Sequence, residues 1–244
     1  MSLGQTLAVV ARVALVRASR RTSTYAIATL TLVPALLGAV LGALHYGSVT
    51  ETAGPVAIRV VGPLLVIALV AGPAGEAFES RTVLYYFTRP VPRAAVLTGE
   101  ALGYAALAAG VLALAGAFLA IANALTGTAD LGSLARIPLG LAGQGVALVG
   151  FCVGVAALFP KHPLVAAIGI LTVTEGALAA VPGVLQYASL SYHVGQLTGL
   201  ATDTADQTQA VAAVPWAASV AALAVYALVP FLLALRVVED RDLT

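Results

Sequence analysis

Six long runs of apolar residues, separated by short polar stretches, constrain the fold of this chain more than any other feature. They cover residues 24–46, 57–78, 93–123, 137–159, 164–185 and 214–235. An α-helix needs ~20 mostly apolar residues to cross the hydrocarbon core of a bilayer, and each run meets that length. The runs are continuous rather than alternating, so a transmembrane β-barrel is not expected. We predict an all-α integral membrane protein, with residues 1–244 forming one transmembrane domain.

The scarcity of charge supports this prediction. Only 9% of the 244 residues are charged and 60% are hydrophobic, whereas a soluble domain is typically ~25% charged. Too few charged side chains are present to cover a surface that faces water. The first apolar run follows Arg20 and Arg21 and is long enough to span, so we expect no cleavable signal peptide.

Residues 1–21 carry four arginines that would lie too deep in a membrane span. On a helix, the apolar side chains of this segment gather on one side: Leu3, Leu7, Val10 and Ala14. The opposite side carries Gln5, Arg12 and Ser19. We predict an amphipathic helix in the membrane interface, with its arginines toward anionic lipid headgroups. A frayed basic tail is the alternative, and binding to nucleic acid is not expected beside a membrane surface.

The distribution of lysine and arginine predicts the orientation of the spans. Ten of the twelve basic residues belong to the N-terminus, the 79–93 segment, the turn at Lys161 and the C-terminal tail. Only Arg59 and Arg136 fall on the other side. We therefore expect a multi-pass protein of the plasma (inner) membrane with both termini in the cytoplasm. The loops expected outside are 47–56, 124–136 and 186–213.

The longest charged passage, residues 76–104, lies between the second and third apolar runs. Residues 79–88 are long enough for about two and a half turns of helix. Pro90 disfavours helix at Arg89, and Pro92 suits the first turn of the next helix, where no N–H is needed. We expect a short cytoplasmic helix, then a rigid corner, then a new span.

The side chains of this passage indicate a contact with a soluble partner. Apolar and aromatic residues cluster at i, i+1, i+3 and i+4 spacing: Val83, Leu84, Tyr86 and Phe87. They can lie on lipid or fill a groove on a partner. The charged side chains that can fix the orientation of such a contact are Glu79, Arg81, Arg89 and Arg93. The alternative is an ordinary basic inner loop.

Residues 76–104 resemble the ABC-2 type export permeases. The family signature there is an acidic residue, Gly-Thr-Leu, a small or hydroxyl residue before Pro-hydrophobic-x-Arg, and then Gly-Lys. The matching positions here are Glu79, 82–84 (Thr-Val-Leu), 88–93 (Thr-Arg-Pro-Val-Pro-Arg) and 97–99 (Leu-Thr-Gly). The charged ending 237–243 also resembles the Arg-Asp-Leu close of the family. Arg81 stands where the family usually has glycine, and Glu100 stands where it usually has a basic residue.

The resemblance implies six spans, a cytoplasmic amphipathic N-terminal helix and a coupling helix between spans two and three. It implies a permease subunit that is not itself an enzyme. Such a subunit forms a homodimer, or pairs with a related permease, and binds two cytoplasmic ABC ATPase subunits. Closure of the ATPases would rock the membrane halves and export a substrate by alternating access. The ATPase-coupling residues that the resemblance implies are Glu79, Arg81, Thr82, Leu84, Phe87, Arg89, Pro90 and Arg93.

The sequence itself contains no nucleotide-binding motif. Lys161 is the only lysine, and no glycine-rich loop precedes it, so a Walker-type phosphate site is not expected. We expect no cofactor in this chain, with ATP and Mg²⁺ held by the partner ATPase. The other expected contact is membrane lipid.

Glu175 is the most unusual single residue. It lies eleven residues into the fifth apolar run, ~16 Å deep at a rise of ~1.5 Å per residue, and an ionisable residue there is a candidate functional residue. Its possible partners along a translocation path are Thr172, Thr174 and, from the fourth apolar run, Gln144. The alternative left open is a break near Gly176 or Pro182, which would make Glu175 face an outer vestibule.

Two other patterns carry less weight. The 24 glycines of the chain make pairs four residues apart common by chance. Such pairs allow close helix packing, and they occur at Gly38/Gly42, Gly99/Gly103 and Gly150/Gly154. The residues that a metal site needs are dispersed, so none is predicted: His45, His162, His193 and Cys152.

These features together predict the transmembrane subunit of an ATP-binding-cassette exporter. The first rival is a non-transporting membrane anchor or assembly subunit, in which residues 79–93 only tether a soluble complex. The second is an intramembrane enzyme using Glu175, for which the sequence shows no partner base, nucleophile or metal cluster. The nearly uncharged spans favour a lipidic or amphipathic cargo over an ion.

Overall fold

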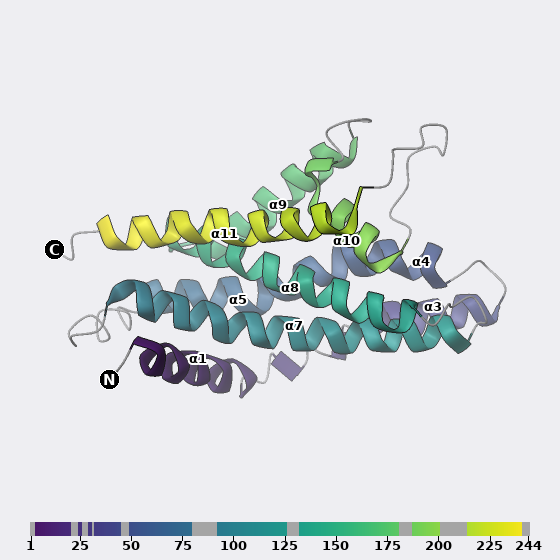
Figure 1. Cartoon of the computed structure of the whole chain (residues 1–244), viewed down its shortest axis with the longest axis horizontal. Helices are drawn as coiled ribbons and strands as arrows, with labels where there is room; N and C mark the ends of the chain where they lie inside the picture. Colours follow the sequence, from purple (N-terminus) through teal and green to yellow (C-terminus); the bar gives the residue numbers. More distant parts are fainter. Residues whose placement is uncertain are drawn as a thin grey trace.

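The computed structural model of the chain is an assembly of helices (Figure 1). The structure describes residues 3–20, 24–25, 29–30, 32–44, 49–79, 92–125, 132–180, 187–200 and 214–240. No strand occurs among these residues. The all-α prediction is therefore confirmed for the described part of the chain.

The helices follow the apolar runs of the sequence. In chain order they are α1 (Leu3–Ser19), α3 (Val33–Ala43), α4 (Val49–Val56), α5 (Gly62–Glu79), α7 (Arg93–Leu125), α8 (Ser133–Leu158), α9 (Pro163–Ala180), α10 (Leu190–Thr198) and α11 (Trp216–Asp240). A π-helical segment, Ala57–Val61, joins α4 to α5 without a break. Pro34 lies in the first turn of α3, where its missing N–H leaves no helical hydrogen bond unmade.

Four helical stretches of the described chain are long and apolar enough to cross a membrane. They are Ala53–Ala74, Arg93–Leu125, Ser133–Leu158 and Trp216–Glu239. The apolar part of α9, Pro163–Ala177, is shorter. The structure thus has the character of a polytopic helical membrane protein. Six spans were expected, and the two crossings beyond these four stay predictions.

Helix α8 occupies the centre of the bundle and packs against α5, α7, α10 and α11. Its contacts with α7 are made where glycine allows close approach. A Cβ atom at Gly116 of α7 would lie 2.7 Å from Cα of Pro138, and one at Gly145 of α8 would lie 3.0 Å from the Ala108 carbonyl carbon. The two pairs run in opposite order along the chain, so α7 and α8 are antiparallel.

The Gly150/Gly154 pair of α8 faces α11. A Cβ atom at Gly150 would overlap the backbone of Ala227, and one at Gly154 would lie 2.7 Å from Pro230. The residue numbers rise together, so α8 and α11 are parallel. This glycine pair, which carried little weight in the sequence, marks a close helix crossing.

The N-terminal helix α1 packs lengthwise on the first turns of α7. Cβ atoms at Gly99 and Gly103 of α7 would lie 2.7 Å from Val10 Cβ and 2.5 Å from the Ala11 carbonyl oxygen, respectively. The side of α1 that carries Val10 and Ala14 therefore packs on α7, whereas Val9, Val13 and Val16 are exposed. The place of this helix in the membrane interface stays a prediction. Glu100 of α7 forms an ion pair with Arg17 of α1, with 3.8 Å between Oε1 and Nη1.

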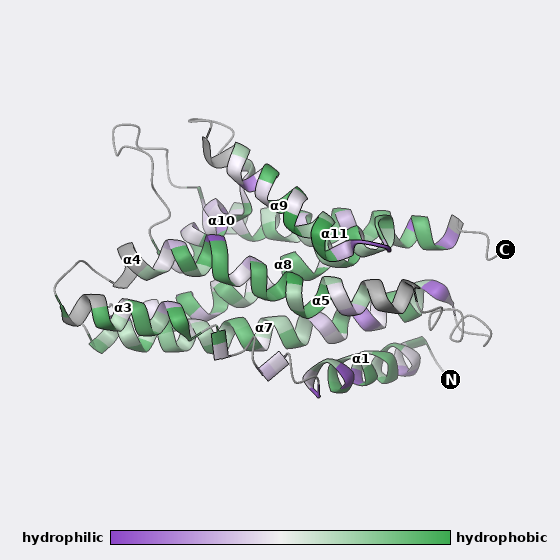
Figure 2. Ribbon diagram, turned by 180° about the vertical axis from the view of Figure 1, so that it is seen from behind, coloured by the Kyte–Doolittle hydropathy of each residue, from purple (hydrophilic) through white to green (hydrophobic). Residues whose placement is uncertain are grey.

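The length of α7 explains how α1 and Glu100 can avoid the hydrocarbon. Its 33 residues span about 50 Å at 1.5 Å per residue, against ~30 Å of hydrocarbon. Part of the helix must extend beyond the apolar layer. Figure 2 shows the hydrophobic residues along the bundle, with hydrophilic residues on α1 and toward the C-terminal end of α11.

The helix directions bring several chain segments to one end of the molecule. The end of α5, the start of α7 and the end of α11 lie at the end of the molecule where α1 begins (Figure 1). Arg93 links two of these segments, because its Nη1 donates to the Val238 carbonyl of α11 at 3.4 Å. The opposite end holds the end of α7 and the starts of α8 and α11.

The outer stretches contain more helix than expected. Residues 49–56, expected largely as a turn, form α4. Within the loop expected at 186–213, residues 190–198 form α10, most of whose residues are buried. Ser189 caps the start of α10 by accepting a hydrogen bond from the Tyr192 amide, and Gly199 ends the helix in the left-handed conformation at φ 71°.

Candidate functional site

The predicted ATPase-coupling residues fall almost entirely outside the described chain. Residues 80–91, which hold Arg81, Thr82, Leu84, Phe87, Arg89 and Pro90, are outside it. Glu79 is the last residue of α5, and its side chain also lies outside the described part. Arg93 is the first residue of α7. The structure therefore describes the two helix ends that this segment connects.

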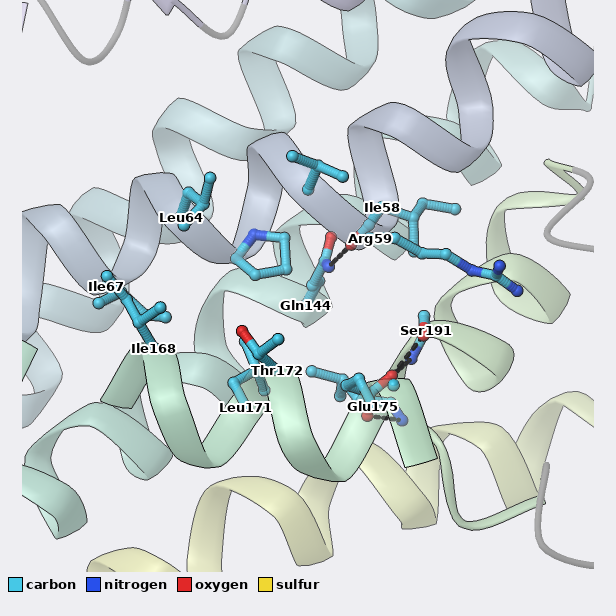
Figure 3. Close-up of a pocket in the computed structure, with 14 residues that line it drawn as sticks. Ile58, Arg59, Leu64, Ile67, Gln144, Ile168, Leu171, Thr172, Glu175 and Ser191 are labelled. Atoms are coloured by element: carbon cyan, nitrogen blue, oxygen red, sulfur yellow. Dashed lines mark hydrogen bonds between the residues drawn. The ribbon is translucent and has the colours of Figure 1, made fainter. Parts of the chain in front are cut away.

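The three candidate translocation-path residues meet in one cavity of about 420 Å³. The cavity lies among the π segment, α5, α8, α9 and α10. Glu175 and Thr172 come from α9, and Gln144 comes from α8 (Figure 3). The side chain of Gln144 is fully buried in the wall of the cavity. The side chain of Thr172 is exposed, and that of Glu175 is half-buried.

The π segment creates a free carbonyl that Gln144 satisfies. The Gly62 amide bonds to the Ala57 carbonyl, five residues back. In the same register the Ile58 carbonyl would need an N–H from Pro63, which has none. Gln144 Nε2 instead donates to the Ile58 carbonyl at 2.6 Å. This bond accounts for a buried amide in an apolar helix, since an unpaired buried carbonyl is costly.

Glycine makes room for this arrangement. A Cβ atom at Gly62 would lie 2.9 Å from Gln144 Oε1. That oxygen has no hydrogen-bond partner among the described residues. The amide is therefore held by its donor side alone, against the backbone of the π segment. Such π-helical interruptions occur frequently at functional sites.

Glu175 holds the first turn of α10. Its Oε1 accepts from the Leu190 amide at 2.8 Å, and its Oε2 accepts from the Ser191 amide at 3.2 Å. Oε2 also accepts from the hydroxyls of Ser189, at 2.7 Å, and Ser191. A carboxylate at this position satisfies amides that have no partner within the helix, and it complements the helix dipole.

Other polar contacts fix α10 against the bundle. His193 is buried, with Nδ1 3.2 Å from Ser219 Oγ of α11 and Nε2 2.7 Å from the Tyr187 carbonyl oxygen. The Tyr226 hydroxyl of α11 donates to the Ala188 carbonyl. A Cβ atom at Gly140 of α8 would lie 2.5 Å from Thr198 Cγ2. His193 therefore belongs to packed structure rather than to an outer loop.

The cavity has a polar end and an apolar end. Figure 3 shows Arg59, Glu175 and Ser191 at one end, Leu64, Ile67 and Ile168 at the other, and Gln144 and Thr172 between them. Its rim is open between α5 and α9, because Leu64, Ile168 and Thr172 are exposed. A cavity of this size and mixed lining is typical of a site for a small molecule.

Arg59 and Ser191 are cavity residues that sequence reasoning did not select. Arg59 lies six residues into the apolar stretch Ala53–Ala74, and a charge inside an apolar run is a signal that marks it. Ser191 lies in a stretch read as loop. Its signal was the pattern of Ser189 as helix cap and Gly199 as helix end.

A small number of polar side chains sets the chemistry that the cavity offers. Among the described residues, no group of three or more His, Cys, Asp or Glu side chains is placed to hold a metal ion. Glu175, the one carboxylate among the described residues of the lining, accepts hydrogen bonds from the start of α10. What the cavity offers a ligand is an apolar wall with a cation at one end.

No family model matches the sequence, and no curated protein matches it. The conclusions about function below therefore rest on the sequence pattern of residues 76–104 and on the geometry described above.

Proposed function

We propose that this chain is the transmembrane subunit of an ATP-binding-cassette exporter. It works as a homodimer, or with a related permease, and separate cytoplasmic ATPase subunits drive it. The segment between α5 and α7 carries the force from the ATPase to the bundle. A substrate then moves outward by alternating access, which requires two conformations with different affinities for nucleotide.

One observation carries this proposal. The arginine-bearing, proline-cornered sequence of residues 79–93 joins α5 to α7 at the end of the molecule where α1 begins and α11 ends. A partner that moved this segment would act on two long helices at once. Arg93 extends the connection to α11 through the Val238 carbonyl.

The proposed topology has six crossings. The four long helices are joined by a first crossing that includes α3, and by a fifth formed by α9 with α10 beside it. Helix α9 has 18 residues and spans about 27 Å, which is close to the ~30 Å hydrocarbon thickness. Both termini lie in the cytoplasm of a plasma (inner) membrane, in line with the distribution of arginine.

The cavity forms part of the proposed translocation path. Thr172 and Glu175 face it from α9, and the π segment lines the other side. Because α5 both lines the cavity and ends at the proposed coupling segment, movement of that segment would change the cavity directly. This link between the two sites distinguishes an exporter subunit from an inert anchor.

The test uses a readout that does not require the cargo to be known. The tagged full chain, with Thr172→Cys in a Cys152→Ser background, is purified with its ATPase and reconstituted. The exporter predicts that labelling of this cysteine changes severalfold when Mg-ATP and vanadate are added. Arg89→Ala should abolish that change while ATP hydrolysis continues, whereas Arg12→Ala on the exposed side of α1 should preserve it.

The rival functions give different results in the same preparation. A membrane anchor would show cysteine labelling that ignores nucleotide. An intramembrane enzyme using Glu175 would lose activity in Glu175→Gln while ATP had no effect. Either result would refute the proposed function.

A further inference from the structure

The distribution of polar and apolar residues around the cavity indicates the kind of ligand that it can bind. The apolar end, with Leu64, Ile67 and Ile168, suits a hydrocarbon chain, and the polar end holds Arg59 and Glu175 (Figure 3). A ligand that fills both ends must be amphiphilic. Its headgroup then has to be complementary to the charge that the polar end presents.

Glu175 contributes little of that charge to a ligand. Its carboxylate already accepts four hydrogen bonds, two from backbone amides of α10 and two from serine hydroxyls. Three of these bonds end on Oε2 and one ends on Oε1, so most of the acceptor capacity of the carboxylate is used within the protein. The positive end of the α10 dipole further offsets its negative charge. Glu175 therefore stabilises the start of α10 and is not expected to bind a cationic headgroup.

Among the described residues that line the cavity, Arg59 is the cationic one. It sits in the π segment, inside the apolar stretch Ala53–Ala74, and is half-buried. A charged residue within a span is costly and generally faces a cavity or a polar partner. The guanidinium has five donors in a planar fork, so it can bind a carboxylate or a phosphate alongside another partner.

The opening of the cavity fits entry from the side of the bundle. Leu64 is 47% exposed and Ile168 is 36% exposed, and Thr172 lies beside them on the exposed face of α9. An acyl chain can therefore reach the apolar end through the gap between α5 and α9. A free anion would gain nothing from this apolar end.

We propose that the cavity binds an amphiphile with an anionic phosphate or carboxylate headgroup, with the headgroup at Arg59 and a hydrocarbon chain between α5 and α9. That this ligand is the exported cargo rests on the proposed function. The binding site itself rests only on the geometry of the cavity and the charge of Arg59.

The binding test uses radiolabelled lysophosphatidate and the full chain in phosphatidylcholine nanodiscs. We expect saturable binding that monoacylglycerol of the same chain length competes at least about tenfold more weakly, since it lacks the charge-assisted contact. Inorganic phosphate should not compete. Equal competition by monoacylglycerol, or full competition by inorganic phosphate, would overturn the proposal.

Matched variants locate the site. Arg59→Gln should weaken binding about tenfold or more, and Arg59→Lys should weaken it less because the charge remains. Lys161→Gln, which removes an exposed cation at the α8–α9 turn, should bind like the unmodified chain.

Since Arg59→Gln can also disturb folding, Ile168→Trp tests the apolar end independently. It should block binding, whereas Val173→Trp on the exposed side of the same helix should not.

The cargo assignment has its own readout. In the reconstituted complex, lysophosphatidate should stimulate ATP hydrolysis, and Ile168→Trp should remove the stimulation. Binding without stimulation in a nucleotide-responsive complex would contradict the cargo assignment and define the ligand as a resident lipid. A complex that ignores nucleotide altogether would refute the exporter, whereas loss of binding in an active exporter would refute this site.

Discussion

At the residue scale, Glu175 supplies from α9 the acceptors that the first turn of α10 lacks. Two amides and two hydroxyls donate to one carboxylate. Because α10 has only nine residues, it is too short to be stable alone in water. Its position therefore depends on contacts made from neighbouring helices, of which the Glu175 contact is one.

We predict that Glu175→Ala loosens α10 locally. The loss of hydrogen bonds to a charged group should cost about 1.5–3 kcal/mol. Hydrogen exchange measured by mass spectrometry should then accelerate at residues 189–198. The control is Thr174→Ala, whose hydroxyl bonds only to carbonyls of its own helix. Unchanged exchange in Glu175→Ala would show that other contacts hold α10.

Gln144 is the second residue whose role is set by backbone geometry. We predict that Gln144→Leu lowers the free energy of unfolding by about 1–3 kcal/mol, because the Ile58 carbonyl loses its donor. In a Pro63→Ala background, residue 63 regains an N–H, so the same substitution should cost less. SDS titration of all four proteins forms a double-mutant cycle. Additive effects would contradict the assignment of Gln144 as a substitute for the missing N–H.

At the element scale, glycine positions decide which helices touch. Gly150 and Gly154 bring α8 onto α11, whereas a Cβ atom at Gly110 of α7 or Gly169 of α9 would meet nothing within 4 Å. The four-residue spacing of Gly150 and Gly154 already sets this pair apart, because no glycine lies four residues from Gly110 or Gly169. The spacing does not show which helix the pair contacts, and only the partner backbone identifies α11.

We therefore predict opposite effects from the same substitution. Gly150→Ala should destabilise the chain by about 1–3 kcal/mol, because its Cβ overlaps the α11 backbone. Gly110→Ala should be neutral or stabilise by up to about 1 kcal/mol through helix propensity. Unfolding by SDS measures both. Equal stability of the two variants would refute the close crossing of α8 and α11.

The elements also show what the sequence can and cannot predict. Long apolar runs predicted helices near α7, α8 and α11, because hydrocarbon length fixes the length of a span. Helix α10 was missed because its polar residues, among them Ser191 and His193, read as a loop, although they are buried through specific partners. The contact of Glu175 with α10 spans an intervening segment, so no local pattern reveals it.

The sequence likewise predicted some features of the cavity residues and not others. Gln144 and Thr172 were selected as possible partners of Glu175, and all three line one cavity. Their contacts were not predictable, because the donor to the Ile58 carbonyl depends on a π segment that apolar periodicity does not indicate. Arg59 was counted only for orientation, although a charge inside an apolar run already marked it as a functional candidate.

At the scale of the whole molecule, α7 runs antiparallel to α8 and α11, so the ends of the long helices gather at two opposite ends of the bundle (Figure 1). We predict that single cysteines in a Cys152→Ser background are labelled from opposite sides of the membrane. Lys161→Cys, in the α8–α9 turn, should react from the cytoplasm. Trp216→Cys, at the start of α11 and 74% exposed, should react from outside.

Impermeant maleimide applied to intact cells and to inverted vesicles measures this orientation. Labelling of both cysteines from the same side would contradict the proposed topology. Reversed sidedness would place residues 79–93 outside the cell, where no ATP-driven partner could reach them.

The central claim is that residues 79–93 transmit force from an ATPase. The most direct measurement is site-specific photo-crosslinking from position 87, with Phe87 replaced by a benzoylphenylalanine residue in intact cells. The account predicts a crosslink to a cytoplasmic nucleotide-binding subunit, with a yield that changes when the ATPase is trapped with vanadate. A crosslink to lipid alone, or a protein crosslink that is indifferent to nucleotide, would contradict it.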